Sequence, residues 1–177
     1  MQDYFTDGRI SIRKYRTGDD AVLYAAICES MSELTRWGFY HVGFTLEDSA
    51  EDVVSRITNW NQGKSYTFII EALPGSVFVG NCSVEEIDFE RHHASLGWWV
   101  RTSRTGRGIA TAAGRLVAQA AFEYLPFSAL SVYTNADNIA SRRVAEKVGA
   151  VLMQIRPEDN GRYCAVYELK PEYLKSE

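Results

Sequence analysis

Short apolar stretches with a period of two residues alternate along this chain with stretches whose apolar residues recur every three or four positions. Ile10 and Ile12, which alternate with polar neighbours, show the first pattern and predict a half-buried strand. Ile109, Ala112 and Leu116 belong to the clearest helical pattern in the chain. Applied along the whole sequence, the two patterns predict strands at 10–13, 66–73, 77–88, 94–101, 129–134, 151–155 and 163–170. They predict helices at about 20–30, from 45 to about 60, from 109 to before Pro126, and at about 139–148.

The order of these elements indicates an α+β fold. Short connections make the three strands between 66 and 101 antiparallel neighbours, whereas the helix that begins at 109 forms a βαβ crossover between parallel strands. We therefore expect a mixed central sheet of about seven strands, antiparallel in its N-terminal half, flanked by about four helices. No linker or repeat interrupts the 177 residues, so one domain over 1–177 is expected.

Composition is that of an ordinary globular protein. Hydrophobic residues make up 46% and charged residues 24%, which argues against disorder. The three cysteines have no zinc or redox spacing and fit a reduced compartment, and no metal site is expected. No segment approaches the ~20 apolar residues that span a bilayer, and the N-terminus has no export pattern, so we expect a cytoplasmic protein without a membrane partner.

Charge is distributed unevenly along the chain. The net charge of −4 argues against general nucleic-acid binding through a basic surface. Residues 91–122, however, contain five arginines and no Asp or Glu, so that this segment carries +5 and the rest of the chain −9. A local basic segment in an acidic protein indicates a confined anion site, the alternative being a solvated helix face.

Within the basic segment, a predicted strand leads through a glycine-containing turn into the N-terminus of the long helix. Glycines let the backbone approach an oxyanion, and the free N–H groups and dipole of a helix N-terminus attract negative charge. A Walker-type loop needs Lys and Ser or Thr after Gly108, where Ile109 and Ala110 stand. A dinucleotide fingerprint needs Gly or Ala at Thr111, in a leading βαβ unit. A nucleotide-dependent kinase or dehydrogenase is therefore disfavoured.

Two motifs carry a resemblance to a known family. The run Thr105-Gly106-Arg107-Gly108-Ile109-Ala110 resembles the acetyl-CoA pyrophosphate loop of the GNAT superfamily of N-acetyltransferases, with Thr105 in place of the usual Gln or Arg and Arg104 beside it. About 30 residues later, Asn138 to Gly149 resembles the family's Asn-x-x-Ser/Ala helix ending in Lys-x-Gly-Phe, with Ala150 replacing the aromatic residue.

The N-terminal half resembles one subgroup of that family. The segments 30–37 and 45–48 are similar to Ser-x-x-His-Leu-x-x-Trp and Thr-x-Glu-Asp of the Rim-type ribosomal-protein N-terminal acetyltransferases, with Glu33 where the subgroup often has His. The resemblance covers the chain roughly from Ile10 to Leu169. It implies the GNAT fold, acetyl-CoA as co-substrate and direct attack of a primary amine on the thioester, and the Rim-type relatives suggest a homodimer.

The resemblance also implies a cofactor site. In the family, the strand that contains Gly97 splays from the next one. A backbone N–H near Trp99 then binds the thioester carbonyl, and Val100 and Arg101 pair with the pantetheine arm. Gly97 itself suggests a bulge, the alternative being a plain packing residue. The residues expected to bind acetyl-CoA are Trp99, Val100, Arg101, Arg104, Thr105, Gly106, Arg107, Gly108, Ile109, Ala110, Thr111, Asn138, Ser141 and Arg143.

The expected catalytic groups differ from those of many relatives. Ser141 is the expected acid for the leaving thiolate, because Ala145 stands where relatives have Tyr. Ser95 stands where relatives often have a Glu base, so the candidates are Glu85 and Glu86, one of which strand alternation sends toward the cleft.

The acceptor amine is expected to be a protein N-terminus or a small amine. Glu33, Trp37 and Tyr40 are its expected contacts, since a carboxylate and aromatic rings attract a cationic amine. The alternative is a non-catalytic acyl-CoA-binding sensor or regulatory protein, which Ser95 and Ala145 favour.

Overall fold

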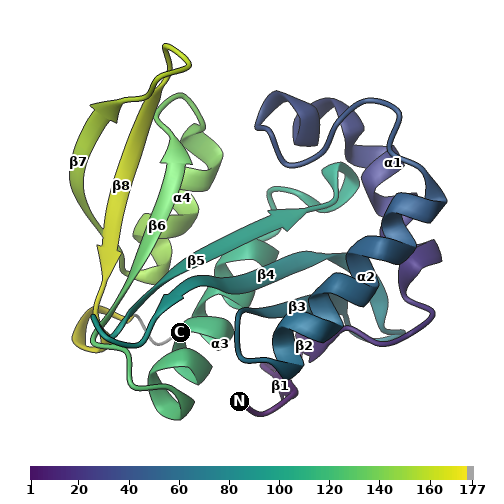
Figure 1. Ribbon diagram of the computed structural model, residues 1–177, viewed down its shortest axis with the longest axis horizontal. Coiled ribbons are helices and arrows are strands. Elements are labelled where there is room, and N and C mark those ends of the chain that lie inside the picture. The colour runs from purple at the N-terminus through teal and green to yellow at the C-terminus, as the bar shows by residue number, and fades with distance from the viewer. Residues whose placement is uncertain (175–177) are drawn as a thin grey trace.

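One mixed sheet of eight strands organises the computed structural model, which describes residues 1–174 (Figure 1). The strand order across the sheet is β1-β2-β3-β4-β5-β6-β8-β7, and every neighbouring pair is antiparallel except β5 and β6. The strands are β1 (Tyr4–Thr6), β2 (Ile10–Lys14), β3 (Tyr66–Ala72), β4 (Val77–Asp88), β5 (His93–Val100), β6 (Ala129–Asn135), β7 (Val151–Pro157) and β8 (Tyr163–Leu169).

Four α-helices and two short 3₁₀ turns flank the sheet within the described residues. They are α1 (Asp20–Arg36), α2 (Leu46–Asn61), α3 (Ile109–Tyr124) and α4 (Ile139–Val148), with the turns η1 (Thr102–Arg104) and η2 (Pro171–Tyr173). The α+β fold and its single parallel crossover are confirmed. The additional strand is β1, which at three residues is too short to show a period, and α1 runs six residues beyond the predicted end because Gly38, with φ of +80°, is the first breaker after it.

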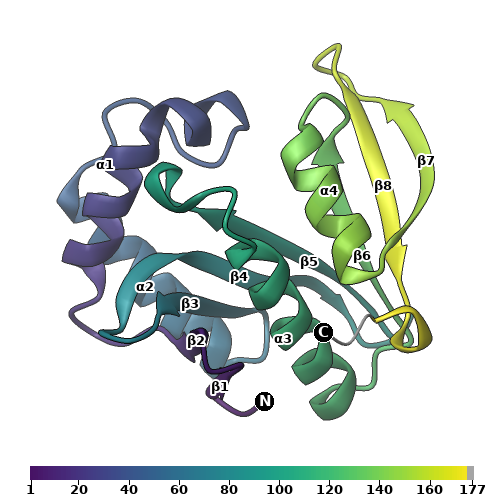
Figure 2. The same ribbon diagram turned by 180° about the vertical axis from the view of Figure 1, so that it is seen from behind.

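The helices form two layers on opposite faces of the sheet. Helices α1 and α2 pack together over β3 and β4, and α3 with α4 covers the other face (Figures 1 and 2). Each face has its own core: Phe68, Val84 and Leu96 point toward α3, whereas Ile69 and Trp99 point toward α1 and α2. Alternation along each strand thus fixes which residues can reach a site on either face.

The two parallel strands separate soon after they begin. Strand β5 pairs with β6 only over His93–Ser95 and Ala129–Ser131, and beyond this contact the strands diverge (Figures 1 and 2). The His93 Nε2 atom lies 2.8 Å from the Ser131 Oγ atom at the closed end. The remainder of β5 therefore pairs with β4 alone, as the resemblance implies.

The irregularities near β5 lie on β4 and not at Gly97, and a further register shift lies between Leu152 and Gln154 of β7. Gly97 pairs in register with Ser83, so the bulge expected there is wrong. The register shifts instead between Glu85 and Asp88, where Glu86 has φ of +50°, and where β4 pairs with β3 at Gly80. A Cβ atom on Gly80 would lie 2.1 Å from the Trp99 carbonyl oxygen, so close strand approach requires glycine at that position.

Candidate functional site

The carboxyl ends of β5 and β6 lead into the N-termini of two helices on the same face. Because β5 and β6 are parallel and α3 and α4 follow them directly, both helix N-termini lie at the end where the strands diverge (Figure 2). Crevices at the carboxyl ends of separating parallel strands are a common place for ligands in sheets of this kind. This end of the molecule is therefore the first candidate site.

The loop before α3 has the geometry of an anion cradle. Gly106 and Gly108 adopt φ of +73° and +77°, and a Cβ atom built on either would meet no atom nearer than 4.0 Å. The N-terminus of α3 has no side-chain cap and no acidic residue in its first turn. Its N–H groups are consequently left for an anion, which the helix dipole also favours. These residues fit the pyrophosphate that the sequence motif implies.

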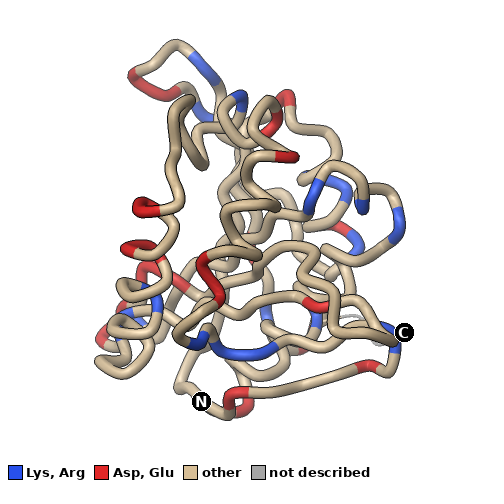
Figure 3. The backbone as a smooth tube through the Cα atoms, turned by 90° about the vertical axis from the view of Figure 1, so that its right-hand side faces the viewer, with Lys and Arg blue, Asp and Glu red and all other residues tan. Residues whose placement is uncertain are grey.

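Basic side chains surround this cradle. Arg104 is half-buried and Arg107 exposed, and among the described residues neither guanidinium group has a hydrogen-bonding or ion-pair partner. A third arginine comes from the turn before β2: the Nη2 atom of Arg9 lies 4.0 Å from where a Cβ on Gly108 would be. Figure 3 shows a group of basic positions close together on the right-hand side of the view, among others elsewhere on the molecule. Arg9 was missed because nothing in the local sequence joins residue 9 to residue 108.

Arg101 is engaged inside the protein. Its N–H donates to the Val79 carbonyl (2.8 Å) and its carbonyl accepts from the Arg104 N–H (2.8 Å). Its guanidinium donates to Glu29 of α1, at 3.0 Å from Nε. Both backbone groups of Arg101 are therefore used, and the expected pairing with the pantetheine arm does not fit this position.

Glu29 holds the start of the loop against α1. Its carboxylate also accepts from the Ser103 N–H (3.1 Å) and hydroxyl, and the neighbouring Ser30 hydroxyl accepts from the Thr102 N–H (3.0 Å). Hydrogen bonds from Ser103, with those from Arg101, lower the pKa of Glu29 from 4.5 to about 2. This contact joins the cradle to the helix layer on the opposite face of the sheet.

The direction of the backbone groups on β5 follows from the same hydrogen bond. Since Arg101 donates to β4 and an antiparallel ladder alternates every residue, the N–H of Trp99 also faces β4. The N–H groups of Trp98 and Val100 then point to the side where β6 has diverged. The N–H of Val100 is thus available for the pairing with the pantetheine arm that the resemblance implies, and the candidate donor for a carbonyl oxygen is Trp98 or Val100 in place of Trp99.

The second motif forms the N-terminus of α4. The Asn138 side chain accepts from the Ser141 N–H (3.1 Å), so it caps the helix. Ser141 is half-buried in the first turn, and its hydroxyl has no partner among the described residues, whereas Arg143 is exposed. Ala145 is 0% exposed and belongs to the core. Of the positions that relatives use for an acid, only Ser141 lies outside the core.

A cavity of about 300 Å³ opens on the other face of the sheet. Charged and aromatic side chains from separate elements line it, and it is called the polar cavity below. Its residues are Phe39 and Tyr40 after α1, Asp52 and Arg56 of α2, Asn81, Ser83 and Glu85 of β4, and Gly97, Trp98 and Trp99 of β5.

Two residues that the sequence analysis predicts for catalysis or acceptor binding, Glu85 and Tyr40, line the polar cavity, where their side chains could contact an amine. Glu85 shares a face with Asn81 and Ser83 and makes no ion pair within the described chain. The Tyr40 hydroxyl donates to Asp52 (3.1 Å), and burial raises the pKa of Tyr40. The indole N–H of Trp99, a residue 6% exposed, has no partner among the described residues.

The other predicted acceptor residues lie elsewhere. Glu33 accepts from the Trp37 indole N–H (3.1 Å) on the last turns of α1, and neither lines the polar cavity. Glu86 sits at the bulge and is also outside it. The structure therefore separates Glu85 from Glu86, which the sequence left as alternatives.

Sequence reasoning missed one ion pair in the polar cavity. Asp52 and Arg56 pair across one turn of α2 (2.9 Å), and Arg56 also donates to the Tyr40 hydroxyl (3.2 Å). The i,i+4 spacing was visible in the sequence but is typical of any exposed helix face. Because each charge of this pair is compensated, Glu85 provides the uncompensated charge of the cavity.

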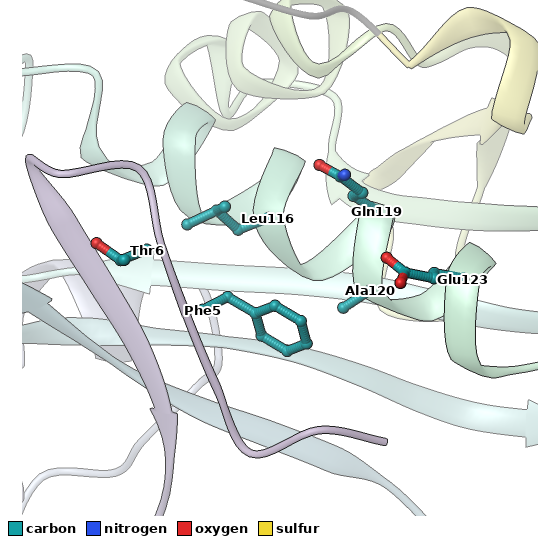
Figure 4. Close-up of a pocket in the computed structure, with 6 residues that line it drawn as sticks. All are labelled: Phe5, Thr6, Leu116, Gln119, Ala120 and Glu123. Carbon is teal, nitrogen blue, oxygen red and sulfur yellow. The ribbon is translucent and has the colours of Figure 1, made fainter.

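A second, smaller hollow lies far along α3 from the cradle. It has a volume of about 190 Å³ and lies between β1 and α3 (Figure 4). Phe5 and Leu116 contribute apolar walls, and Glu123 is its only charged residue. It has neither a glycine loop nor converging polar groups. Within residues 1–174, no cluster of His, Cys, Asp and Glu is arranged to hold a metal, and no helix is long and apolar enough to cross a bilayer.

The cradle and the polar cavity fit one class of protein, an enzyme that binds a phosphate-bearing co-substrate at a glycine loop and a second substrate on the opposite face of the sheet. The family model for the acetyltransferase (GNAT) domain matches residues 9–151. The chain therefore belongs to the GNAT acetyltransferases, which transfer the acetyl group of acetyl-CoA to an amine.

Relatives and solved structures agree with this membership. The chain is 28% identical over 142 residues to "Putative ribosomal N-acetyltransferase YdaF" of Bacillus subtilis, covering 79% of this chain and 76% of the relative. RimJ of Mycobacterium smegmatis, solved with a CoA disulfide, superposes with a TM-score of 0.84 at 22% identity, covering 95% of this chain and 85% of that one. The ribosomal-protein-S5-alanine acetyltransferase of Vibrio fischeri gives 0.86 at 15%, over 99% and 100%. The Rim-type resemblance is confirmed.

Proposed function

We propose that residues 1–177 act as one acetyltransferase domain that acetylates the α-amino group of a protein N-terminus. The observation that carries this proposal is the arrangement around β5: an anion cradle at its end, backbone N–H groups freed by the divergence from β6, and an acidic polar cavity on the other face. The names of relatives support a ribosomal or other protein acceptor over a small amine.

The cofactor side of the proposal rests on backbone and basic groups. The N–H groups at Gly106, Gly108 and the first turn of α3 hold the pyrophosphate, with Arg104 and Arg107 adding charge-assisted bonds. Arg9 is added to the residues named from the sequence, and Arg101 is assigned a different role, which is to fix the loop through Glu29. Asn138 shapes the start of α4, and Arg143 is exposed beside it.

The chemical step needs a base for the amine, a hydrogen-bond donor that polarises the thioester carbonyl, and an acid for the leaving thiolate. Acetyl-CoA supplies the acetyl group. We assign Glu85 to take the proton from the acceptor ammonium, because it is the uncompensated carboxylate of the polar cavity. The N–H of Trp98 or Val100 would polarise the thioester carbonyl. As the C–S bond breaks, the Ser141 hydroxyl would pass its proton to the thiolate sulfur and would regain one, through solvent, from the nitrogen that becomes the amide.

The acceptor approaches through the polar cavity. Glu85 attracts the ammonium, and the rings of Tyr40 and Trp99, whose centroids are 6.2 Å apart, form a wall. Glu33 and Trp37 pair with each other, so Tyr40 remains as the contact from that segment.

The second candidate function is a non-catalytic acyl-CoA sensor. It is favoured by Ser95, half-buried opposite Glu85 where relatives often carry the base, and by the buried Ala145. A sensor needs the cradle but not the uncompensated carboxylate of the polar cavity.

The test measures binding and turnover separately. Calorimetry with acetyl-CoA reports the cradle, and CoA release with a panel of N-terminal peptides and small amines reports catalysis. We expect binding with turnover on peptides. Binding without turnover on any amine would support the sensor, and no binding would overturn both functions.

Two further expectations remain proposals. The exposed Cys28 and buried Cys82 and Cys164 are free thiols, which supports a reducing, cytoplasmic location. A homodimer remains a prediction from the Rim-type relatives, and sedimentation of the purified chain tests it.

A further inference from the structure

Gly97 lies in the middle of β5 although neither its backbone nor its neighbours require glycine. It pairs in register with Ser83 and does not have a positive φ. A Cβ atom built there would meet only the Ser83 Oγ atom, at 3.5 Å, which is ordinary van der Waals contact. Glycine in a strand interior loses conformational entropy on folding and provides no side chain to pack. Folding alone therefore gives no reason for glycine at this position.

The other glycines of the chain show the contrast. All thirteen lie in the described part, and eleven of them have a positive φ that other residues rarely adopt. The two exceptions are Gly97 and Gly114, and a Cβ on Gly114 would lie 3.0 Å from the Val148 Cγ2 atom of α4. Gly114 is thus explained by helix packing. Gly97 is the one glycine with both an ordinary backbone and room for a side chain.

The room beside Gly97 is the polar cavity itself. Side chains at positions 95, 97 and 99 of β5 project to the same face, and Trp99 and the paired Ser83 both line the cavity. Glu85, the proposed base, lies two residues from Ser83 on the same face of β4. A side chain at position 97 would therefore occupy space next to the amine that Glu85 receives.

We propose that Gly97 sets the size of the side chain that the acceptor can carry on the carbon next to its amine. This inference rests on the proposed function, in which the polar cavity receives a peptide N-terminus. Without a side chain at 97, the first residue of the peptide fits between Ser83 and Trp99. The cation of the cavity, Arg56, is paired with Asp52, so uncharged first residues suit it better than acidic ones.

The experiment fills this space in two steps. The variants Gly97→Ala and Gly97→Val are compared with the unaltered protein on tetrapeptides that differ only in a first residue of Gly, Ala, Val or Leu. Ser95→Val is the control: it places the same valine side chain on the same face of β5, two residues before Gly97, at a position that does not line the polar cavity. Calorimetry with acetyl-CoA and thermal unfolding confirm that each variant binds and folds.

The readout is the ratio of kcat/KM for the Gly peptide to that for the Leu peptide. One methylene that fits or clashes in a substrate pocket changes such ratios by roughly 10- to 200-fold. Because a valine at 97 would clash with the Leu side chain of the peptide, we expect Gly97→Val to raise the ratio at least about tenfold. Gly97→Ala, which adds a smaller side chain, should raise it less. Ser95→Val should leave it unchanged. Equal ratios across active, folded variants would overturn the role of Gly97. Acetyl-CoA binding without acetylation of any peptide by the unaltered protein would instead overturn the proposed function and the acceptor role of the cavity with it.

Discussion

The two faces of the sheet build their sites in different ways. On the α3 face, the cradle is made of consecutive residues, and backbone N–H groups provide most of its polarity. On the α1–α2 face, the polar cavity takes one or more side chains from each of four separate segments. A backbone site tolerates side-chain changes but not a change of conformation, whereas a side-chain site changes with every substitution. We therefore expect substitutions to affect the proposed acceptor site more readily than the proposed co-substrate site, where only a change of backbone conformation or a blocking side chain should matter.

The largest effect is expected from blocking the backbone site. Gly108→Trp places a bulky side chain where the cradle is open and should abolish acetyl-CoA binding in calorimetry. Gly161→Trp is the matched control, because Gly161, in the β7–β8 loop, has nearly the same φ (+78° against +77°) and a Cβ there would also meet no atom nearer than 4.0 Å. Both variants carry the same backbone strain. Unchanged affinity in Gly108→Trp, or equal losses in the two, would contradict the cradle assignment.

A large effect of another kind is expected in the polar cavity. Glu85→Gln keeps the shape of the side chain and removes the base, so kcat/KM for a peptide acceptor should fall by about 100-fold or more, with acetyl-CoA affinity unchanged. Glu86→Gln, one residue along β4 but outside the cavity, should behave as the unaltered protein. A loss of activity in Glu86→Gln alone would contradict the assignment of Glu85. It would show that the bulge directs the Glu86 carboxylate, and not that of Glu85, toward the acceptor amine.

The same contrast explains what the sequence could predict. The cradle could be predicted because its glycines and two of its arginines lie together between 104 and 108, and the fold because the helices and every strand except the three-residue β1 have a recognisable sequence pattern. The polar cavity could be predicted only in part. The sequence left Glu85 and Glu86 as alternative bases, because it does not show the bulge at Glu86. The Asp52–Arg56 pair has the spacing of any ion pair on a helix surface. Arg9 lies beside Gly108, about a hundred residues later in the sequence, and Glu29 accepts a hydrogen bond from Ser103, about seventy residues later. Such distant contacts leave no local pattern.

An intermediate effect is expected at the start of α4, which belongs to the second motif. Ser141→Ala removes the hydroxyl but keeps the N–H that Asn138 caps, so the helix should remain intact. If Ser141 protonates the thiolate, kcat should fall by about 10- to 100-fold while the KM for acetyl-CoA stays the same. Ser141→Thr, which retains a hydroxyl, should recover part of the loss. Full activity in Ser141→Ala would contradict this role and would show that solvent water protonates the leaving thiolate.

The smallest effect is expected where the two faces are joined, at Glu29. Glu29→Gln weakens the bonds from Ser103 and Arg101 that hold the loop to α1, and the two charged side chains are 31% and 23% exposed. Partly exposed pairs of this kind contribute roughly 0.2–1 kcal/mol, so the KM for acetyl-CoA should rise no more than about fivefold, with kcat unchanged. Glu33→Gln, one turn further along α1, controls for loss of a charge.

Acid should remove the difference between Glu29→Gln and the unaltered protein. The pKa of Glu29 is lower in the folded chain, about 2, than its usual 4.5, so its contribution to the free energy of unfolding is complete above pH 4.5 and disappears as the pH falls toward 2. Urea unfolding of both proteins across this range measures the difference directly. If the difference in free energy of unfolding stayed the same near pH 2, the Glu29 carboxylate would not be what holds the loop. Packing of the loop against α1 would then be the contact that joins the two faces of the sheet.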